Sequence, residues 1–411
     1  MYKATMKWIR RAVLISSNSH AACGLELFFL MCAVNLAAGT PPLTVDSPEV
    51  QADRRVTFRF LAPNAKDVVL QSEFAWSTRM KKDNDGIWSV TAGPLEPDLY
   101  AYWFTVDDGV PVLDPANSWV RTNLQTLWSL VRVPGSVPLL WDVQDVPHGI
   151  VHRHFYHSKV IGDDRDYYVY TPPGYDPAGP VRYPVLYLLH GLGDEAVSWS
   201  SVGCAHVILD NLIAEGKVRP MILVMPLGYG RPPAEVVGWM KRHRTDAEIW
   251  RHRKGSKEDL ELWLRFITGF RDRLLTEVMP QVEQCYRVDA SRESQAIAGL
   301  SMGGTQSLYT GLNRPDRFAW VGAFSSGTPP KADGSFGVDF PGLDTKGNPP
   351  LRLIWLGCGK DDFVLRQSQQ LHELLQTKGV RHVYKETTGN HTFLVWRRYL
   401  AEFASLLFRR D

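Results

Sequence analysis

Short runs in which apolar and polar residues alternate dominate the first part of the chain, from about residue 44 to residue 140. They include "RVTFRFLAP", "KDVVLQS", "GIWSVTAGPL" and "LYAYWFTVDDG", and Asn, Asp, Gly and Pro residues separate them. A period of two places apolar side chains on one face of a strand. Region 44–140 is therefore predicted to be a small all-β sandwich. The Pro-rich stretch that follows predicts an extended linker over 141–150.

The pattern changes after about residue 149, where continuous apolar runs alternate with helical segments. The runs are "YPVLYLLHG", "MILVMPLG", "SQAIAGL", "AWVGAFS" and "LRLIWLGCG". Continuous runs are typical of parallel strands that helices cover on both faces. Between them, segments such as "AHVILDNLIAEGK" and "LRQSQQLHELLQTKG" carry apolar residues three and four apart, as helices with one buried face do. Residues 151–411 are therefore predicted to form a doubly wound α/β domain with a mostly parallel sheet.

The first 39 residues resemble neither region. Four basic residues lie within the first eleven, and the apolar run "LELFFLMCAVNLAAG" ends in small residues. This pattern predicts a signal peptide over 1–39 and a secreted or periplasmic protein. The run is too short to span a membrane. The alternative is a frayed or misassigned start ahead of an apolar tail, because Glu26 and Asn35 interrupt the run.

Composition and charge exclude some classes of function. The chain has 411 residues, of which 44% are hydrophobic and 22% charged, an ordinary globular composition. A net charge of +2 argues against a nucleic-acid partner or a polybasic membrane anchor. The histidines and carboxylates show no close metal-ligand spacing, so neither a metal nor an organic cofactor is predicted. The pattern makes no prediction of oligomeric state.

Ser301 lies in "AIAGLSMGGTQSL", between a predicted buried strand and a predicted helix. The motif Gly-x-Ser-x-Gly is short, and a serine that merely caps a helix is the alternative reading. A nucleophilic serine at a sharp strand-to-helix turn needs small neighbours, which Gly299 and Gly303 provide. The amides of the following helix favour negative charge that develops beside the serine. Ser301 is therefore the candidate nucleophile.

A serine nucleophile requires a base and a carboxylate that orients the base. His391 lies in a Gly-Asn-His turn directly before the last predicted helix, and Asp361 and Asp362 follow the strand "LRLIWLGCG". The order Ser, Asp, His is that of the α/β-hydrolases, so the α/β domain is predicted to have the α/β-hydrolase fold. The pattern leaves the choice between the two aspartates open, since either could cap the next helix.

Ester hydrolysis also requires hydrogen-bond donors for the oxyanion. The loop "HGLG" after the first predicted parallel strand places the Leu192 amide as one donor, and the Met302 amide, next to Ser301, as the other. His190 is predicted to support this loop. Trp199 could line an acyl pocket, although simple packing is an equal alternative.

Several segments together carry a family resemblance. They are "RDYYVYTPPGYD", "RYPVLYLLHGLGDEAVSW", "LDNLIAEGKVRPMILVMPLG", "LLTEVMPQVEQCYRVDASRESQAIAGLSMGG", "FAWVGAFSSG" and "GNHTFLVWRRYL". They resemble the putative esterase family, which includes the feruloyl and acetylxylan esterases of carbohydrate esterase family one, enterochelin esterases, esterase D and mycolyltransferases. The resemblance covers nearly all of 149–411. Region 44–140 is similar to the early-set, immunoglobulin-like domain that precedes such catalytic domains.

The resemblance implies roles for particular residues. The family pattern makes Ser301 the nucleophile and His391 the base. Its acid is the third residue after a strand-ending glycine, here Gly359, which selects Asp362 over Asp361. One departure is the stretch 231–270, which is longer and more basic than the family pattern. Because loops at this edge of the sheet shape the pocket, the departure bears on substrate specificity.

Three functions follow from these observations. The first is a secreted serine esterase that removes feruloyl or acetyl groups from plant polysaccharide, with an ester-substituted saccharide or a small aromatic ester as partner. The second is a siderophore esterase of the enterochelin type. The third is a non-catalytic carbohydrate-binding protein, against which the complete Ser301, Asp362 and His391 set argues. The sandwich is expected to act by packing, with sugar binding by its exposed aromatic residues, such as Trp76 and Trp88, as the alternative.

Overall fold

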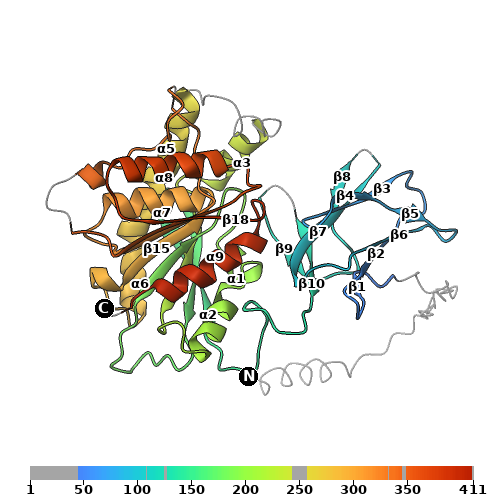
Figure 1. The fold of residues 1–411 in the computed structure, drawn as a ribbon, viewed down its shortest axis with the longest axis horizontal. Helices are drawn as coiled ribbons and strands as arrows, with labels where there is room; N and C mark the ends of the chain where they lie inside the picture. The colour runs from blue at the N-terminus through green and yellow to red at the C-terminus, as the bar shows by residue number, and fades with distance from the viewer. Residues whose placement is uncertain are drawn as a thin grey trace, which may run out of the picture. The chain divides into compact units, whose positions relative to one another are not determined.

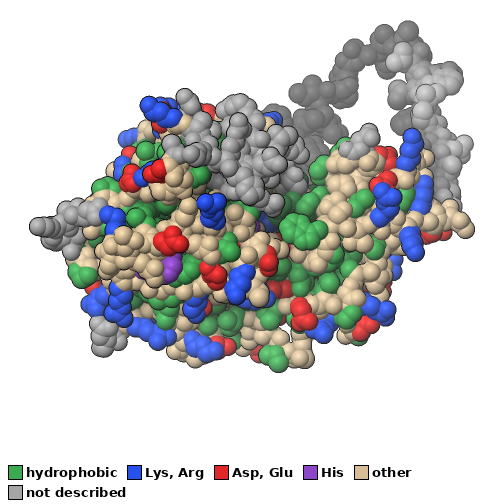
Figure 2. Space-filling model, turned by 45° about the horizontal axis from the view of Figure 1, so that its top comes forward, with side chains coloured by type: hydrophobic (Ala, Val, Ile, Leu, Met, Phe, Trp, Pro, Cys, Tyr) green, Lys and Arg blue, Asp and Glu red, His purple; other side chains and the backbone are tan. Residues whose placement is uncertain are grey.

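The computed structural model describes residues 45–107, 109–124, 127–242, 257–331, 333–344 and 349–409. The predicted signal peptide lies outside the described residues, and so does the centre of the basic stretch, 243–256. The described residues from Val45 onward form one compact unit, and Figure 1 labels many of its elements. Within the described ranges no helix has the length and apolar composition needed to cross a bilayer. On the face drawn in Figure 2, basic and acidic side chains are mixed with hydrophobic and uncharged ones.

Two antiparallel sheets form the β-sandwich. Its strands are β1 (Glu49–Val50), β2 (Val56–Leu61), β3 (Val68–Ser72), β4 (Trp76–Arg79), β5 (Lys81–Lys82), β6 (Ile87–Ala92), β7 (Asp98–Val106), β8 (Val110–Val112), β9 (Val120–Arg121) and β10 (Trp128–Val133). One sheet has the order β1-β2-β6-β5, and the other has the order β4-β3-β7-β10-β9, with β8 paired to β7. The predicted alternation is visible in β2, where Val56, Phe58 and Phe60 enter the sandwich core.

Strand β7 is buried on both faces. Tyr102 and Phe104 belong to the sandwich core, whereas Leu99 and Ala101 belong to the main core of the α/β region. Trp141, in the predicted linker, belongs to the same main core. Because its two faces enter two different cores, β7 joins the sandwich to the α/β region.

An eight-stranded sheet forms the centre of the α/β region. Its strands are β11 (Ile150–Ser158), β12 (Asp163–Thr171), β13 (Val185–Leu189), β14 (Ile222–Pro226), β15 (Gln295–Leu300), β16 (Trp320–Phe324), β17 (Leu353–Gly359) and β18 (Val383–Thr387). The order is β11-β12-β14-β13-β15-β16-β17-β18. The pairs β11–β12 and β12–β14 are antiparallel, and the remaining pairs are parallel. The prediction of an α/β-hydrolase fold preceded by a small all-β region is confirmed.

Helices cover both faces of this sheet (Figure 1). They are α1 (Ser198–Ser201), α2 (Ala205–Ala214), α3 (Pro233–Arg242), α5 (Lys257–Arg273), the π-helical turn η1 (Leu274–Val278), α6 (Met279–Cys285), η2 (Arg292–Ser294), α7 (Met302–Asn313), η3 (Pro341–Asp344), α8 (Leu365–Thr377) and α9 (Phe393–Leu406). In β13, Leu186 and Leu188 pack with residues of α2 and α9, whereas Val185 and Tyr187 pack with residues of α5, α7 and α8. Burial on both faces explains the continuous apolar runs.

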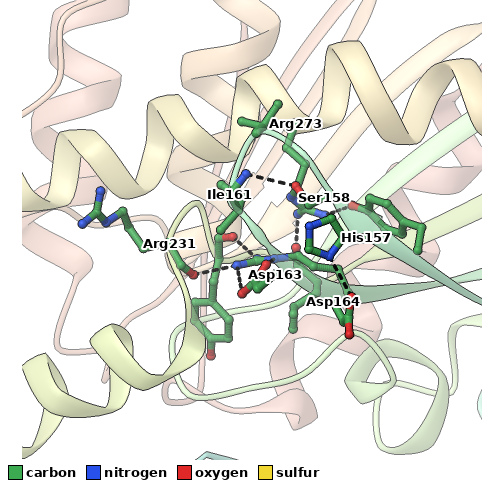
Figure 3. A network of polar contacts seen from close by, with 12 residues as sticks. His157, Ser158, Ile161, Asp163, Asp164, Arg231 and Arg273 are labelled. Atoms are coloured by element: carbon green, nitrogen blue, oxygen red, sulfur yellow. Dashed lines mark hydrogen bonds and ion pairs between the residues drawn. The ribbon is translucent and has the colours of Figure 1, made fainter.

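A carboxylate holds the turn between β11 and β12, which Figure 3 shows from close by. Glu277, in η1, accepts hydrogen bonds from the Ser158 hydroxyl at 2.7 Å and from the amides of Lys159 and Val160 at 2.7 and 2.9 Å. The turn therefore has a charged partner on the helix that packs beside it.

Two fully buried arginine side chains in the same region hold the loop that follows β14. Arg165 donates to the carbonyl oxygens of Tyr229 and Arg231. Arg273 donates to the carbonyl oxygen of Leu227. Since Tyr229 also contacts the loop after β13, these arginines support the edge of the sheet at which the predicted site lies.

Candidate active site

Ser301 forms the sharp turn between β15 and α7. Its backbone has φ 52° and ψ −119°, a conformation that a non-glycine residue rarely adopts, and its side chain does not cap α7. A Cβ atom on Gly303 would lie 2.5 Å from the His190 carbonyl oxygen, and one on Gly299 would lie 2.6 Å from Gly303. The strained turn and both glycines are features of a nucleophile held at the end of a strand.

His391 and Asp362 are in direct contact. His391 Nδ1 lies 2.9 and 3.0 Å from the two carboxylate oxygens of Asp362. Asp362 follows β17 and its side chain is fully buried, and His391 lies between β18 and α9 with a partly exposed ring. The rings of Trp396 and Phe363 pack against the imidazole, with centroids 4.9 and 4.4 Å away. These contacts leave the imidazole little freedom to rotate.

The environment of Asp362 favours its charged form. Burial alone would raise the pKa of this carboxyl, but the charge and hydrogen bond of His391 lower it, as do hydrogen bonds from the Val364 amide and the Ser325 hydroxyl. The result is a pKa below the usual aspartate value. A carboxylate that stays ionised can hold the proton of His391 on Nδ1 and leave Nε2 free to accept a proton.

Ser301 and His391 line one cleft with a volume of about 780 Å³. Leu192 and Asp361 line it too, while Asp362 lies behind His391. Among the described contacts there is no hydrogen bond between the Ser301 hydroxyl and His391. Such bonds are often long in unliganded sites and shorten when substrate binds. No group of three or more metal-ligating side chains was found among the described residues.

The loop after β13 lies beside Ser301. A Cβ atom on Gly191 would lie 3.3 Å from the Ser301 Cβ atom, and Leu192 lines the cleft. Met302 is the first residue of α7, so its amide is among those at the N-terminus of this helix without a partner inside it. Leu192 and Met302 thus lie on two elements beside the serine, and the role of their amides as oxyanion donors stays a prediction.

His190 supports this loop, and its own hydrogen bonds define which ring nitrogen carries the proton. Its Nε2 atom accepts a hydrogen bond from the Gly228 amide at 2.7 Å, so Nδ1 carries the proton and donates to the Gly191 carbonyl at 2.8 Å. Burial lowers the pKa of His190, which favours this neutral form. The position agrees with the predicted supporting role.

A segment of the sandwich, residues 121–124, also holds the loop. The Arg121 guanidinium donates to the Asp194 carboxylate at 2.6 Å in a pair that is almost fully buried. The Leu124 amide donates to the Gly193 carbonyl at 2.7 Å, and the Thr122 hydroxyl donates to Glu195 at 2.6 Å. Sequence reasoning missed this segment, because nothing in its local pattern indicates a partner some 73 residues away.

Trp199 occupies the core rather than the cleft. It is fully buried, packs edge-to-face on Phe324 and Phe393, and donates from Nε1 to the Leu189 carbonyl at 2.9 Å. It supports the end of β13, and the packing alternative describes it better than an acyl-pocket wall.

One of the two sandwich tryptophans also differs from expectation. Trp88 is buried, with its Nε1 donating to Ala62, so the expectation that it is exposed is wrong. Trp76 is 71% exposed and lines the cleft. The alternation of apolar and polar residues along a strand does not show which of its faces another part of the chain covers.

Comparisons with known proteins agree with this architecture. The endo-1,4-beta-xylanase/feruloyl esterase of Xylanibacter ruminicola is 29% identical over 374 residues, which span 88% of this chain but only 46% of that protein. The structure of the ferulic acid esterase of the anaerobic fungus Anaeromyces mucronatus is 26% identical, covers 64% of this chain and 91% of its own, and has a TM-score of 0.52.

The enterobactin esterase of Shigella flexneri has the same fold over a longer stretch. It covers 85% of this chain and 92% of its own, with a TM-score of 0.61 and 19% identity. The family model described as "Putative esterase" matches residues 158–405, more than half of the chain. The predicted resemblance is thereby confirmed, and the chain belongs to the Putative esterase family.

Proposed function

We propose that this protein is a serine esterase that hydrolyses carboxylic esters through an acyl-enzyme intermediate. One observation carries the proposal: the Asp362–His391 pair opens into the same cleft as Ser301, at the strained turn between β15 and α7. In this assignment Ser301 is the nucleophile, His391 the general base and Asp362 the residue that orients His391.

The reaction has two halves. His391 Nε2 accepts the proton of the Ser301 hydroxyl as Oγ attacks the ester carbonyl, and the amides of Leu192 and Met302 donate to the resulting oxyanion. The tetrahedral intermediate then expels the alcohol, which takes the proton from His391. In the second half, water gives its proton to His391 and attacks the acyl-serine, and the carboxylic acid leaves as Ser301 regains its proton.

The substrate we propose is a feruloyl or acetyl ester of plant polysaccharide. Support comes from the feruloyl esterase activity in the name of the Xylanibacter relative, and from the Anaeromyces esterase, whose structure has also been solved with ferulic acid. The charges of the cleft point the same way. Arg121, the only Lys or Arg among the described cleft residues, is paired with Asp194. An iron-loaded tris-catecholate siderophore carries negative charge. The described part of the cleft has no unpaired cation that would bind it.

The test compares wild type and Ser301→Ala on methyl ferulate, acetylated xylan and enterobactin. Wild type is expected to hydrolyse the first or second, and Ser301→Ala is expected to lose on the order of 10⁴ to 10⁶ in kcat. A variant that retained a tenth of the wild-type rate would refute the role of Ser301. Preference for enterobactin would replace the proposed substrate while leaving the serine chemistry intact.

We also propose that the protein is exported, because the basic start and apolar run within residues 1–39 have the form of a signal peptide. Expression of the full chain in a bacterial host, followed by N-terminal sequencing of protein from the periplasm or medium, tests this. A cytoplasmic product that retains residue 1 would refute it.

A further inference from the structure

The carboxyl end of β16 lies between β15, which leads to the proposed nucleophile, and β17, which leads to the proposed acid. Its last residue, Phe324, accepts a hydrogen bond at its carbonyl from the Ser301 amide, at 2.8 Å. The next residue, Ser325, has a fully buried side chain. We propose that Ser325 is a positioning residue: its hydroxyl, held by Trp396, fixes the orientation of the Asp362 carboxylate. The inference rests on the proposed ester hydrolysis and gives a role to a residue that the sequence pattern did not identify.

The Ser325 hydroxyl forms hydrogen bonds on two sides. The Trp396 indole donates from Nε1 to Ser325 Oγ at 3.0 Å, and both side chains are buried. An indole N–H can only donate, so Oγ is the acceptor and the serine proton remains free for another partner. That partner is the Asp362 carboxylate, to which the Ser325 hydroxyl also hydrogen bonds. The direction of this chain of hydrogen bonds is therefore fixed, from Trp396 through Ser325 to Asp362.

The thiol of Cys358, on β17, is the other neighbour that could accept the serine proton. Burial raises the pKa of Cys358 to about 12, so the group is a neutral thiol near pH 7 and a weak acceptor. Asp362 differs, because the charge and hydrogen bond of His391 outweigh burial and hold the pKa of its carboxyl below the usual value. A charged carboxylate forms the stronger hydrogen bond. The Ser325 proton is therefore directed to Asp362.

The backbone of Ser325 is strained. Its φ of 49° lies in the left-handed region that residues other than glycine rarely adopt. Such strain persists only where surrounding contacts enforce it, and it is concentrated at active sites. One such contact is the hydrogen bond from the Ser325 amide to the Gly357 carbonyl of β17, at 2.7 Å. Trp396 also packs against His391, with ring centroids 4.9 Å apart, so Ser325 connects the acid with the tryptophan that restrains the base.

The first test is Ser325→Ala, which keeps the Cβ atom and removes only the hydroxyl. On the ester that wild type hydrolyses best, kcat is expected to fall about 10- to 100-fold with little change in KM, the factor that corresponds to one hydrogen bond to a charged group. The acidic limb of kcat/KM against pH should move to higher pH, because Asp362 without this donor favours the protonated form of His391 more strongly.

Ser368→Ala is the matched control for this variant. Ser368 is a buried serine whose hydroxyl donates to the Ser326 carbonyl at 3.1 Å, and no described contact joins its side chain to Asp362 or His391. Its loss should change neither kcat nor the pH profile. An unchanged kcat in Ser325→Ala overturns the inference, and so does a loss that Ser368→Ala shares, since that loss would reflect packing alone.

The second test asks whether Ser325 and Trp396 act as one unit. Trp396→Phe keeps an aromatic ring beside His391 and removes the Nε1 donor. The double variant with Ser325→Ala should lose less activity than the product of the two single losses, because either change already breaks the chain of hydrogen bonds. Single losses that multiply in full would overturn the role given to Trp396.

Two further measurements keep the inference testable. If Ser325→Ala does not fold, Ser325→Gly replaces it, because glycine also lacks the hydroxyl and adopts a φ of 49° without strain. If wild type hydrolyses no ester, the proposed function fails, and the rate at which a fluorophosphonate probe labels Ser301 decides the role of Ser325. Slower labelling of the variant supports that role, whereas equal labelling, or none in wild type, overturns it.

Discussion

The contacts of Asp362 distinguish it from its neighbour Asp361. Its carboxylate accepts hydrogen bonds from His391 Nδ1 and from the Val364 amide, and its side chain is fully buried. Asp361 lines the cleft but has no contact with His391 among those described. The two aspartates are therefore expected to differ sharply in their effect on activity.

Replacing Asp362 by Asn is expected to lower kcat about 10³- to 10⁴-fold, because an amide can present its NH₂ group to Nδ1 and stabilise the wrong tautomer of His391. Asp361→Asn is the matched control, and its effect should be small. Turnover of methyl ferulate at pH 7 measures both. Equal modest losses in the two variants would mean that another residue orients His391.

His190 links pH to stability through its neutral form. Its pKa is lowered by burial, so the folded state binds a proton less readily than the unfolded chain, whose histidine pKa is about 6.5. The contribution of neutral His190 to stability is thus complete above that value and decreases as the pH falls below it towards the folded pKa. Protonation would place a second N–H against the Gly228 amide.

The urea midpoint of wild type is therefore expected to fall between pH 7 and pH 5, and the fall should be smaller in His190→Gln, which has no group that titrates there. His157→Gln, at a largely exposed histidine on β11, is the control. Burial also lowers the pKa of His206, so part of the pH dependence should persist. An identical pH dependence in wild type and His190→Gln would contradict this account.

At the scale of elements, the loop after β13 depends on a segment that is not part of the α/β fold. Residues 121–124 of the sandwich contact it through Arg121, Thr122 and Leu124, and Tyr229 contacts it from the loop after β14. The Arg121 guanidinium also lies over the rings of Trp128 and Phe393, 4.2 and 5.0 Å from their centroids. The candidate oxyanion site is thus held from both sides.

Arg121→Ala is expected to lower kcat at least about tenfold with a smaller change in KM, because donors that are misplaced for the oxyanion weaken transition-state binding in particular. It should also lower the free energy of unfolding by about 3 kcal/mol, since Asp194 is left buried without its partner. Steady-state kinetics and urea unfolding measure the two effects, and Arg121→Lys should restore part of each.

Arg132→Ala is the control for this prediction. Arg132 pairs with the buried Asp142 at 2.9 Å in the same part of the chain, and it is not among the cleft residues. Its loss should affect stability without lowering kcat. If both variants lowered kcat equally, the Arg121 effect would be one of general stability.

At the scale of the whole molecule, the sandwich and the α/β region share a core. Leu99, Ala101 and Leu130 of the sandwich pack with residues of α2 and α9. The fully buried Arg397 of α9 donates to the Asp98 carboxylate at 2.7 Å and to the Leu99 carbonyl at 2.8 Å. Removal of the sandwich would expose apolar surface and leave a buried arginine without two of its partners.

A chain truncated to 151–411 is therefore expected to be insoluble, or to unfold at a much lower temperature than the full protein. Solubility and thermal unfolding by circular dichroism measure this. Arg397→Met in the full chain is a milder version, which removes the charge and the contacts while keeping much of the apolar volume. A truncated domain with an unchanged unfolding temperature would show that the shared core contributes little.

The sequence by itself determined the features that depend on neighbours in the chain. Continuous apolar runs identified β13 to β17, because strands covered on both faces have no polar side. The glycines around Ser301 identified its turn, because close backbone approach excludes a Cβ atom. Strand β11 was not predicted, since it lies at the edge of the sheet and its exposed and half-buried residues give no apolar run.

Only the tertiary structure decided which distant groups meet. The sequence pattern did not choose between Asp361 and Asp362 as the acid, and only the family resemblance favoured Asp362. Its contact with His391 appears in the folded chain. The pairs Arg121–Asp194 and Arg397–Asp98 join residues 73 and 299 positions apart. Local patterns report whether a side chain will be buried, but the partner of a buried charge depends on how whole elements pack. For that reason the sandwich residues that line the cleft of Ser301, Trp76 among them, could be recognised only in the structure.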